Sequence, residues 1–124
     1  MLRACRRLLR PGGRMAFVTI FVAPGLTASE YRRALRSGPT FVSSRRKDHT
    51  ELIASAGFSH IEETDLTAEF SVTSRAWETE RREQAAELIA AEGEAAFNER
   101  QSDLDVQSSA IEAGLLRRSL FVCS

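Results

Sequence analysis

The fold of this chain is decided by the stretch LLRPGGRMAFVTIFV, residues 8–22. Pro11 cannot continue a helix, because its ring blocks the preceding turn and it has no backbone N–H. Gly12 and Gly13 then permit a tight reversal. The apolar residues that follow, Met15 to Val22, are rich in β-branched and aromatic side chains, which is typical of a strand. The sequence therefore predicts a helix, a turn and a strand in this order.

Signals on either side of this stretch predict further helices. Upstream, Leu2, Cys5, Leu8 and Leu9 would share one face of a short helix. The strand at 15–22 is apolar almost without alternation, so we expect it to be covered on both faces within a mostly parallel sheet. Downstream, two pairs of residues have capping-box spacing and each predicts a helix. They are Thr27 with Glu30, ahead of a helix over about 28–35, and Asp48 with Glu51.

The second half of the chain is predicted to contain a strand, a helical region and a last strand. The alternation that begins near residue 59 changes phase at Asp65, which indicates a bulge or strand end there. From 73 to 114 the apolar spacing is helical, with a break at Gly93 and Ser102 as a candidate internal cap. A short apolar strand, 120–123, follows. The prediction is an α/β fold in a single domain over 1–124.

The composition is that of an ordinary globular protein. Of 124 residues, 43% are hydrophobic and 27% are charged, and 17 basic side chains balance 17 acidic ones. Without net charge there is no global field to attract nucleic acid or an anionic membrane, so neither is expected as a partner. Cys5 and Cys123 offer no disulfide framework and no zinc spacing, which favours free thiols in a reducing cytoplasm.

One alternative to a cytoplasmic protein stays open at this point. Arg6-Arg7 ahead of the apolar run loosely imitates a twin-arginine export signal, whose residues would be removed in the mature protein. The turn at 11–13 separates the arginines from the apolar run, and the run itself has the composition of a buried strand. Both observations favour the cytoplasmic interpretation over export.

Residues 8–17 resemble a segment of the class I S-adenosylmethionine (SAM)-dependent methyltransferases, in which a Leu-Arg-Pro-Gly-Gly turn ends a helix and leads into the fifth strand. Three later segments resemble, in order, the entry to the sixth strand, the stretch after it and the reversed seventh strand: Ala56-Gly57-Phe58, 65–77 and 114–122. The resemblance implies the C-terminal half of that fold. It would be a partial Rossmann-like sheet of about three strands, the last one antiparallel, with helices that include a helical insertion before this last strand.

The resemblance also implies a missing cofactor site. The family holds SAM with a glycine-rich loop after its first strand and an acidic residue that ends its second, and this chain would begin after both. The glycines of the chain form no G-x-G-x-x-G loop, so no residue is expected to bind a cofactor. SAM would be the cofactor of the complete family fold and not of this truncated chain alone. Whether the chain acts as an enzyme is left open.

Substrates of this family often sit over the carboxyl ends of the strands, as ligands do in open α/β sheets. The resemblance therefore implies a small-molecule acceptor site lined by Phe21, Phe70, Arg75 and Trp77. The alternative is that Phe21 and Phe70 fill the core and that Trp77 packs on its helix. No catalytic residue is assigned, because methyl transfer needs alignment of the reactants more than an acid or a base.

The remaining polar residues give weaker indications of a site. His49 and His60 are the two imidazoles, and either could act as a general base, but neither has a carboxylate or cysteine arranged beside it. The acidic group at 62–65 lacks the spacing of metal ligands, so no metal is expected. Arg45-Arg46-Lys47 could contact phosphate, although a solvated loop is the simpler interpretation.

The strand from Met15 to Val22 would lie beside the family's fourth strand, which this sequence does not contain. An unpaired apolar edge tends to pair with another chain, so we expect a homodimer or a complementary chain at this strand. The function expected is that of a SAM-dependent methyltransferase-like protein that cannot bind SAM or transfer a methyl group alone. The alternative is a non-catalytic interaction or ligand-binding module, derived from a methyltransferase, that dimerises through this edge.

Overall fold

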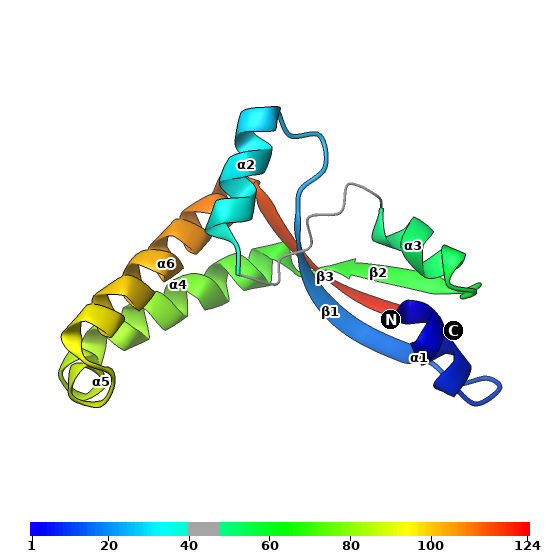
Figure 1. Cartoon of the computed structure of the whole chain (residues 1–124), viewed down its shortest axis with the longest axis horizontal. Helices are drawn as coiled ribbons and strands as arrows, with labels where there is room; N and C mark the ends of the chain where they lie inside the picture. The colour runs from blue at the N-terminus through cyan, green and yellow to red at the C-terminus, as the bar shows by residue number, and fades with distance from the viewer. Residues whose placement is uncertain (40–47) are drawn as a thin grey trace.

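The computed structural model describes residues 1–39 and 48–124, so the triplet Arg45-Arg46-Lys47 lies outside the described residues. Helices and strands alternate along the chain, which confirms the predicted α/β class (Figure 1). In chain order the elements are α1 (Leu2–Leu8), β1 (Met15–Val22), α2 (Ala28–Ser37), α3 (His49–Ser55), β2 (Ile61–Asp65), α4 (Thr67–Glu83), α5 (Ala85–Glu92), α6 (Glu94–Glu112) and β3 (Leu116–Cys123).

The three strands of the described residues form one sheet in the order β1-β3-β2. The last strand in the sequence is therefore the middle strand of the sheet, and it runs antiparallel to both neighbours. Cys123 pairs with Met15 on one side and with Ile61 on the other. This confirms the expected three strands, with the last one reversed and a helical insertion before it. It also makes β1 an edge strand within the described part of the chain.

Each face of the sheet is covered by its own helices. On the face that we call the α3 face, Phe121 and Ile53 belong to a buried cluster against which Leu2 of α1 also packs. On the opposite face, the hairpin face, Leu116 packs with Phe70 of α4 and Ile111 of α6. Helices α4 and α6 run side by side away from the sheet as a helical hairpin, with α5 at its tip (Figure 1). Two small cores therefore lie back to back across the strands.

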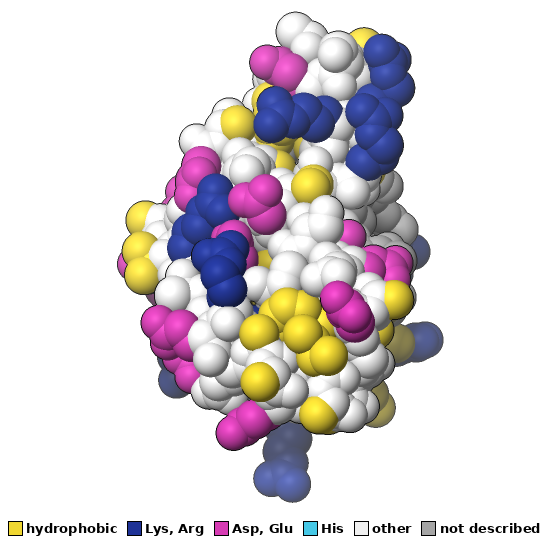
Figure 2. Space-filling view, turned by 90° about the vertical axis from the view of Figure 1, so that its left-hand side faces the viewer, with side chains coloured by type: hydrophobic (Ala, Val, Ile, Leu, Met, Phe, Trp, Pro, Cys, Tyr) yellow, Lys and Arg dark blue, Asp and Glu magenta, His cyan; other side chains and the backbone are white. Residues whose placement is uncertain are grey.

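The helical hairpin is held together by polar contacts between α4 and α6. Ser74 and Ser108, both buried, share a hydrogen bond of 2.6 Å between their hydroxyl oxygens. Arg75 on α4 donates from Nε and Nη2 to the carboxylate of Glu112 on α6, at 2.7 and 3.0 Å. Charges of both signs are interspersed over the outer surface at this end of the molecule, beside one group of hydrophobic side chains (Figure 2).

Local chemistry sets the turns and helix starts as the sequence predicts. Gly12 has a φ of +76°, and the amide of Gly13 donates to the carbonyl of Arg10 at 2.8 Å, which closes the reversal before β1. A capping box begins α2. In it the Thr27 amide donates to Glu30 Oε2 at 2.8 Å and the Glu30 amide donates to Thr27 Oγ1 at 3.2 Å.

The predicted coverage of the first helix and strand is wrong in two places. Leu8, expected on the apolar face of α1, is 84% exposed, because α1 ends there and the chain turns at Pro11. Val18, in the middle of β1, is 45% exposed, because the hairpin covers only the end of β1 that contains Ile20 and Val22. An apolar run without alternation therefore did not imply burial on both faces here.

Three predicted boundaries in the second half also differ from the structure. The helix expected from 73 begins at Thr67, because the carboxylate of Asp65 accepts the Thr67 amide at 2.9 Å and turns the chain directly into α4. The last strand begins at Leu116 and not at 120, since β3 pairs with β1 along its whole length, whereas β2 pairs only with residues 119–123. Ser102 lies inside α6 and caps nothing. Among the described helices, none combines the length and apolar character needed to cross a membrane.

Candidate functional site

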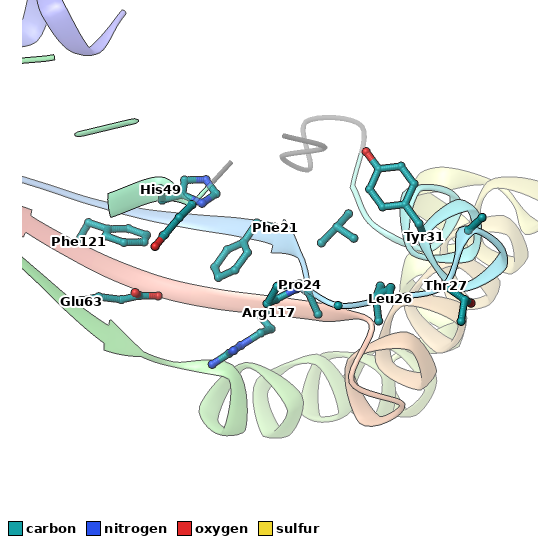
Figure 3. Close-up of a pocket in the computed structure, with 14 residues that line it drawn as sticks. Phe21, Pro24, Leu26, Thr27, Tyr31, His49, Glu63, Arg117 and Phe121 are labelled. Atoms are coloured by element: carbon teal, nitrogen blue, oxygen red, sulfur yellow. The ribbon is translucent and has the colours of Figure 1, made fainter. Parts of the chain in front are cut away.

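A cavity of about 560 Å³ opens on the α3 face, at the end of β1 (Figure 3). The loop that leaves β1 and the first turn of α2 form one wall, and the start of α3 forms another. Its volume lies within the range of small-molecule sites, which are typically a few hundred to about 1,000 Å³. Its aromatic and charged lining includes the side chains of Phe21, Tyr31, His49, Glu63, Arg117 and Phe121.

Three rings from three different elements meet on one side of this cavity. The imidazole of His49 on α3 lies 4.9 Å from the ring centroid of Phe21 on β1 and 5.5 Å from that of Phe121 on β3. Phe121 is 1% exposed and stacks on Phe17 at 5.4 Å, so its ring is fixed by the core. The imidazole therefore lies on a rigid aromatic floor. Tyr31 lies on the opposite side of the opening, on α2 (Figure 3).

The charged groups of the cavity are engaged with neighbours on the sheet. Glu63 on β2 accepts a hydrogen bond of 2.8 Å from the hydroxyl of Ser119 on β3. Arg117 forms an ion pair with Asp65. The hydroxyl and backbone amide of Thr67, and then Arg117, lower the pKa of Asp65 to about 2. The guanidinium at the cavity is thus already neutralised by a carboxylate outside it.

The two helix N-termini that face the cavity carry acidic caps of their own. Glu30 closes the start of α2, and its hydrogen bonds with the backbone and side chain of Thr27 lower the pKa of its carboxyl group. Asp48 caps α3 by accepting the amide of Thr50 at 3.0 Å. A helix N-terminus attracts anions only while its amides are unoccupied. The carboxylates of Glu30 and Asp48 occupy part of these amides and place a negative charge at each helix start, which disfavours a phosphate or carboxylate of a ligand there.

The structure does not gather the four predicted substrate residues into one site. Phe21 lines the cavity on the α3 face. Phe70 and Trp77 line a second cleft, on the hairpin face. Arg75 bridges α4 and α6, and its contacts with the carboxylates of Glu112, Asp105 and Glu78 raise its pKa, so a ligand would have to displace them.

Of the two imidazoles, the cavity takes in His49 alone. His60 lies before β2, where its backbone pairs with Ser124, and its side chain is exposed. From the acidic group at 62–65, Glu63 points to the cavity. Among residues 1–39 and 48–124 no group of three or more His, Cys, Asp or Glu side chains is placed to hold a metal ion.

Sequence reasoning missed four residues that line the cavity. Glu63 and Phe121 are directly paired across β2 and β3, and Arg117 comes from the part of β3 that the sequence did not predict as strand. No sequence signal gives the register of two strands 56 residues apart. Tyr31 was accessible to reasoning, because it lies four residues after the helix cap Thr27 and so shares its face of α2.

No family model and no curated protein sequence matches the chain, but solved structures do. One is phosphoethanolamine N-methyltransferase 2 of Haemonchus contortus, in complex with phosphomonomethylethanolamine and S-adenosylhomocysteine. It matches 98% of this chain at a TM-score of 0.80 and 16% identity, over 28% of its own length. Mycolic acid cyclopropane synthase CmaA1, complexed with S-adenosylhomocysteine and CTAB, matches 98% at a TM-score of 0.79 and 19% identity, over 47% of its length.

The cyclopropane synthase MmaA2 of Mycobacterium tuberculosis gives a similar result, with a TM-score of 0.76 and 16% identity over 98% of this chain and 47% of that one. The chain therefore spans less than half the length of each of these three neighbours. At such identities the likeness concerns the fold alone. It agrees with the α/β arrangement and the reversed central strand described above.

Proposed function

We propose that this chain, whose fold is that of part of the SAM-dependent methyltransferases, is the acceptor-binding part of such a fold. The observation that carries the proposal is the aromatic cavity at the end of β1, since ligands of open α/β sheets bind at the carboxyl ends of the strands. SAM is the cofactor of the complete fold. The chain alone does not bind SAM and does not transfer a methyl group.

The acceptor is a small neutral or cationic molecule. Aromatic faces attract cations, and the cavity presents the rings of Phe21, His49 and Phe121 beside the carboxylates of Asp48 and Glu63. The acidic caps of α2 and α3 disfavour an anionic group at the same opening. His49 is the group that would accept the proton lost by an acceptor oxygen or nitrogen on methylation.

The absence of SAM binding is inferred from the glycines and the helix starts. A nucleotide-type loop needs glycines between a strand and a helix whose N-terminal amides are open to the ligand. Gly25 is the glycine between β1 and α2, with a φ of +75°. At the start of the helix that follows it, the capping box occupies the amides of Thr27 and Glu30 and places the Glu30 carboxylate there, which disfavours the anionic groups of a nucleotide.

Calorimetry tests the cofactor part of the proposal. The chain is titrated with SAM and with S-adenosylhomocysteine, and we expect no binding heat. Micromolar binding of either compound would overturn this part. Translation of the DNA upstream of the codon for Met1 provides an independent test, because an in-frame glycine-rich loop there would supply the cofactor half.

The acceptor part is tested with two probes that share a ring and differ in charge. Benzyltrimethylammonium should shift the NMR signals of His49 and Phe21 in a saturable manner, and benzoate should not. Glu63→Gln should weaken the response to the cation, whereas Glu62→Gln, on the other face of the same strand, should leave it unchanged. Equal responses to both probes, or none, would refute the acceptor chemistry.

A second candidate function is a non-catalytic module that dimerises through β1. The observation that favours it is the open edge of this strand, which pairs only with β3 in the described part of the chain and leaves Ala16 and Val18 exposed. Two antiparallel copies of one edge are self-complementary about a two-fold axis. Light scattering at high concentration should then show a dimer that Val18→Lys dissociates and Val72→Lys, on α4, does not. A stable monomer would exclude this candidate.

A further inference from the structure

A second cleft, of about 670 Å³, lies on the hairpin face, so the sheet separates it from the cavity on the α3 face. Its walls come from the middle of β1, the C-terminal end of α2, and the facing sides of α4 and α6. Val18 and Ile20 point into it because they alternate along β1 with Phe21, which points to the other face. Nothing in the proposed methyl-acceptor role uses this cleft.

The cleft gathers much of the apolar surface that the molecule exposes. Among the large hydrophobic residues that are exposed in the described part of the chain, three line it: Val18, Trp77 and Val106, at 45%, 58% and 46% exposure. Buried Phe70 and Leu104 form its floor. Contiguous exposed apolar surface that is also concave marks a binding site more often than an isolated exposed residue does.

The charged groups around the cleft are mostly cationic. Arg36, Arg100 and Arg118 line it together with a single carboxylate, that of Asp103. None of these three arginines forms an ion pair with another described residue, whereas every arginine that does form one lies elsewhere. The Arg118 guanidinium instead lies 5.4 Å above the ring of Phe70, at the apolar floor. Guanidinium groups bind carboxylates and related oxyanions in a bidentate manner.

We infer that this cleft binds a small anionic amphiphile, a molecule with one apolar chain and one oxyanion headgroup. The chain would lie against Trp77, Val106 and Val18, and the headgroup would pair with the arginines at the rim. The volume favours a small molecule over a partner protein, because about 670 Å³ is the size of a ligand site, whereas a docked helix needs a longer groove. The inference is independent of methyl transfer.

Fluorescence of Trp77, the only tryptophan of the chain, reports binding directly. Dodecanoate, titrated below its micellar concentration, should shift the emission of Trp77 to shorter wavelength with a saturable curve. Dodecyltrimethylammonium, with the same chain and the opposite charge, should bind at least about tenfold more weakly, as expected for loss of a charged hydrogen bond. Equal affinity for the two probes, or no saturable shift, would overturn the inference.

Two variants on α2 distinguish binding in the cleft from non-specific attraction of an anion to basic residues at the surface. Arg36→Gln should weaken dodecanoate binding by about tenfold, because it removes one guanidinium from the rim. Arg32→Gln, four residues earlier and outside the cleft, should have no effect. Both positions are at the surface, and circular dichroism would verify that each variant is folded. Equal losses of dodecanoate affinity in the two variants would refute the small-molecule site. A shift of Trp77 emission with an acidic helical peptide but not with dodecanoate would refute it as well.

Discussion

The hydroxyl groups of Ser74 and Ser108 meet between α4 and α6, and removing either one should lower the free energy of unfolding. Their oxygens are 2.6 Å apart, and the residues are 1% and 0% exposed. Replacing either serine by alanine leaves the other hydroxyl buried without its partner, which typically costs about 1–3 kcal/mol. The remaining hydroxyl can turn to the carbonyl four residues earlier in its helix. We therefore expect a loss of about 1 kcal/mol from each single variant.

The double variant Ser74→Ala/Ser108→Ala should lose less than the sum of the two single losses. It leaves no hydroxyl without a partner, and alanine is the better helix former. We expect a total loss under about 1 kcal/mol and a coupling of about 1 kcal/mol between the sites. Urea unfolding followed by circular dichroism measures it, and Ser102→Ala on the exposed side of α6 serves as the control, within about 0.5 kcal/mol of the parent. Additive losses would refute the reasoning.

Other residues give three further predictions. Phe121→Ala removes a side chain that is 1% exposed and should lower the free energy of unfolding by about 3–5 kcal/mol in the same assay; a loss below about 1 kcal/mol would contradict its place in the core. The folded-state pKa of Asp65, about 2, lies below its ordinary value of 3.8. The stabilisation that the Asp65 carboxylate adds to the folded state is therefore full above about pH 4 and is lost as the pH falls through 2. Asp65→Asn should flatten the curve of unfolding free energy against pH between about pH 2 and 4 by under about 1 kcal/mol, since the carboxylate is 49% exposed. An unchanged curve would argue against a stabilising role of this carboxylate. Burial raises the pKa of the Cys123 thiol, so iodoacetamide should label Cys5 faster in the folded chain, and equal rates measured by mass spectrometry would count against this.

Elements fixed by local chemistry could be predicted from the sequence. The reversal at Pro11-Gly12-Gly13 depends on backbone properties of those residues, and the start of α2 depends on the reciprocal hydrogen bonds between Thr27 and Glu30, which are three residues apart. The start of β3 at Leu116 could not be predicted, because Arg117 and Arg118 interrupt the apolar pattern. Their extended conformation depends on the pairing with β1, in which Arg117 lies opposite Phe21 and Arg118 lies opposite Ile20.

The candidate site was less predictable than the fold because strand register decides it. Phe21 was identified from its place at the end of a strand, and the structure puts it in the cavity. Phe70 and Trp77 belong to the opposite face, which depends on where α4 begins and on the path of the hairpin. Phe121 joins the cavity through a cross-strand pair, and no local signal in the sequence indicates such a pair.

The position of β3 between β1 and β2 imposes an order on folding. The two outer strands share no hydrogen bonds with one another, so neither has a neighbour until the segment latest in the sequence arrives between them. The pairing of Met15 with Cys123 closes a loop of nearly the whole chain, and contacts so distant in sequence slow folding. Until that step, the helical hairpin is the part of the chain that can form through contacts close in sequence, and the apolar segment Met15–Val22 has no strand to pair with.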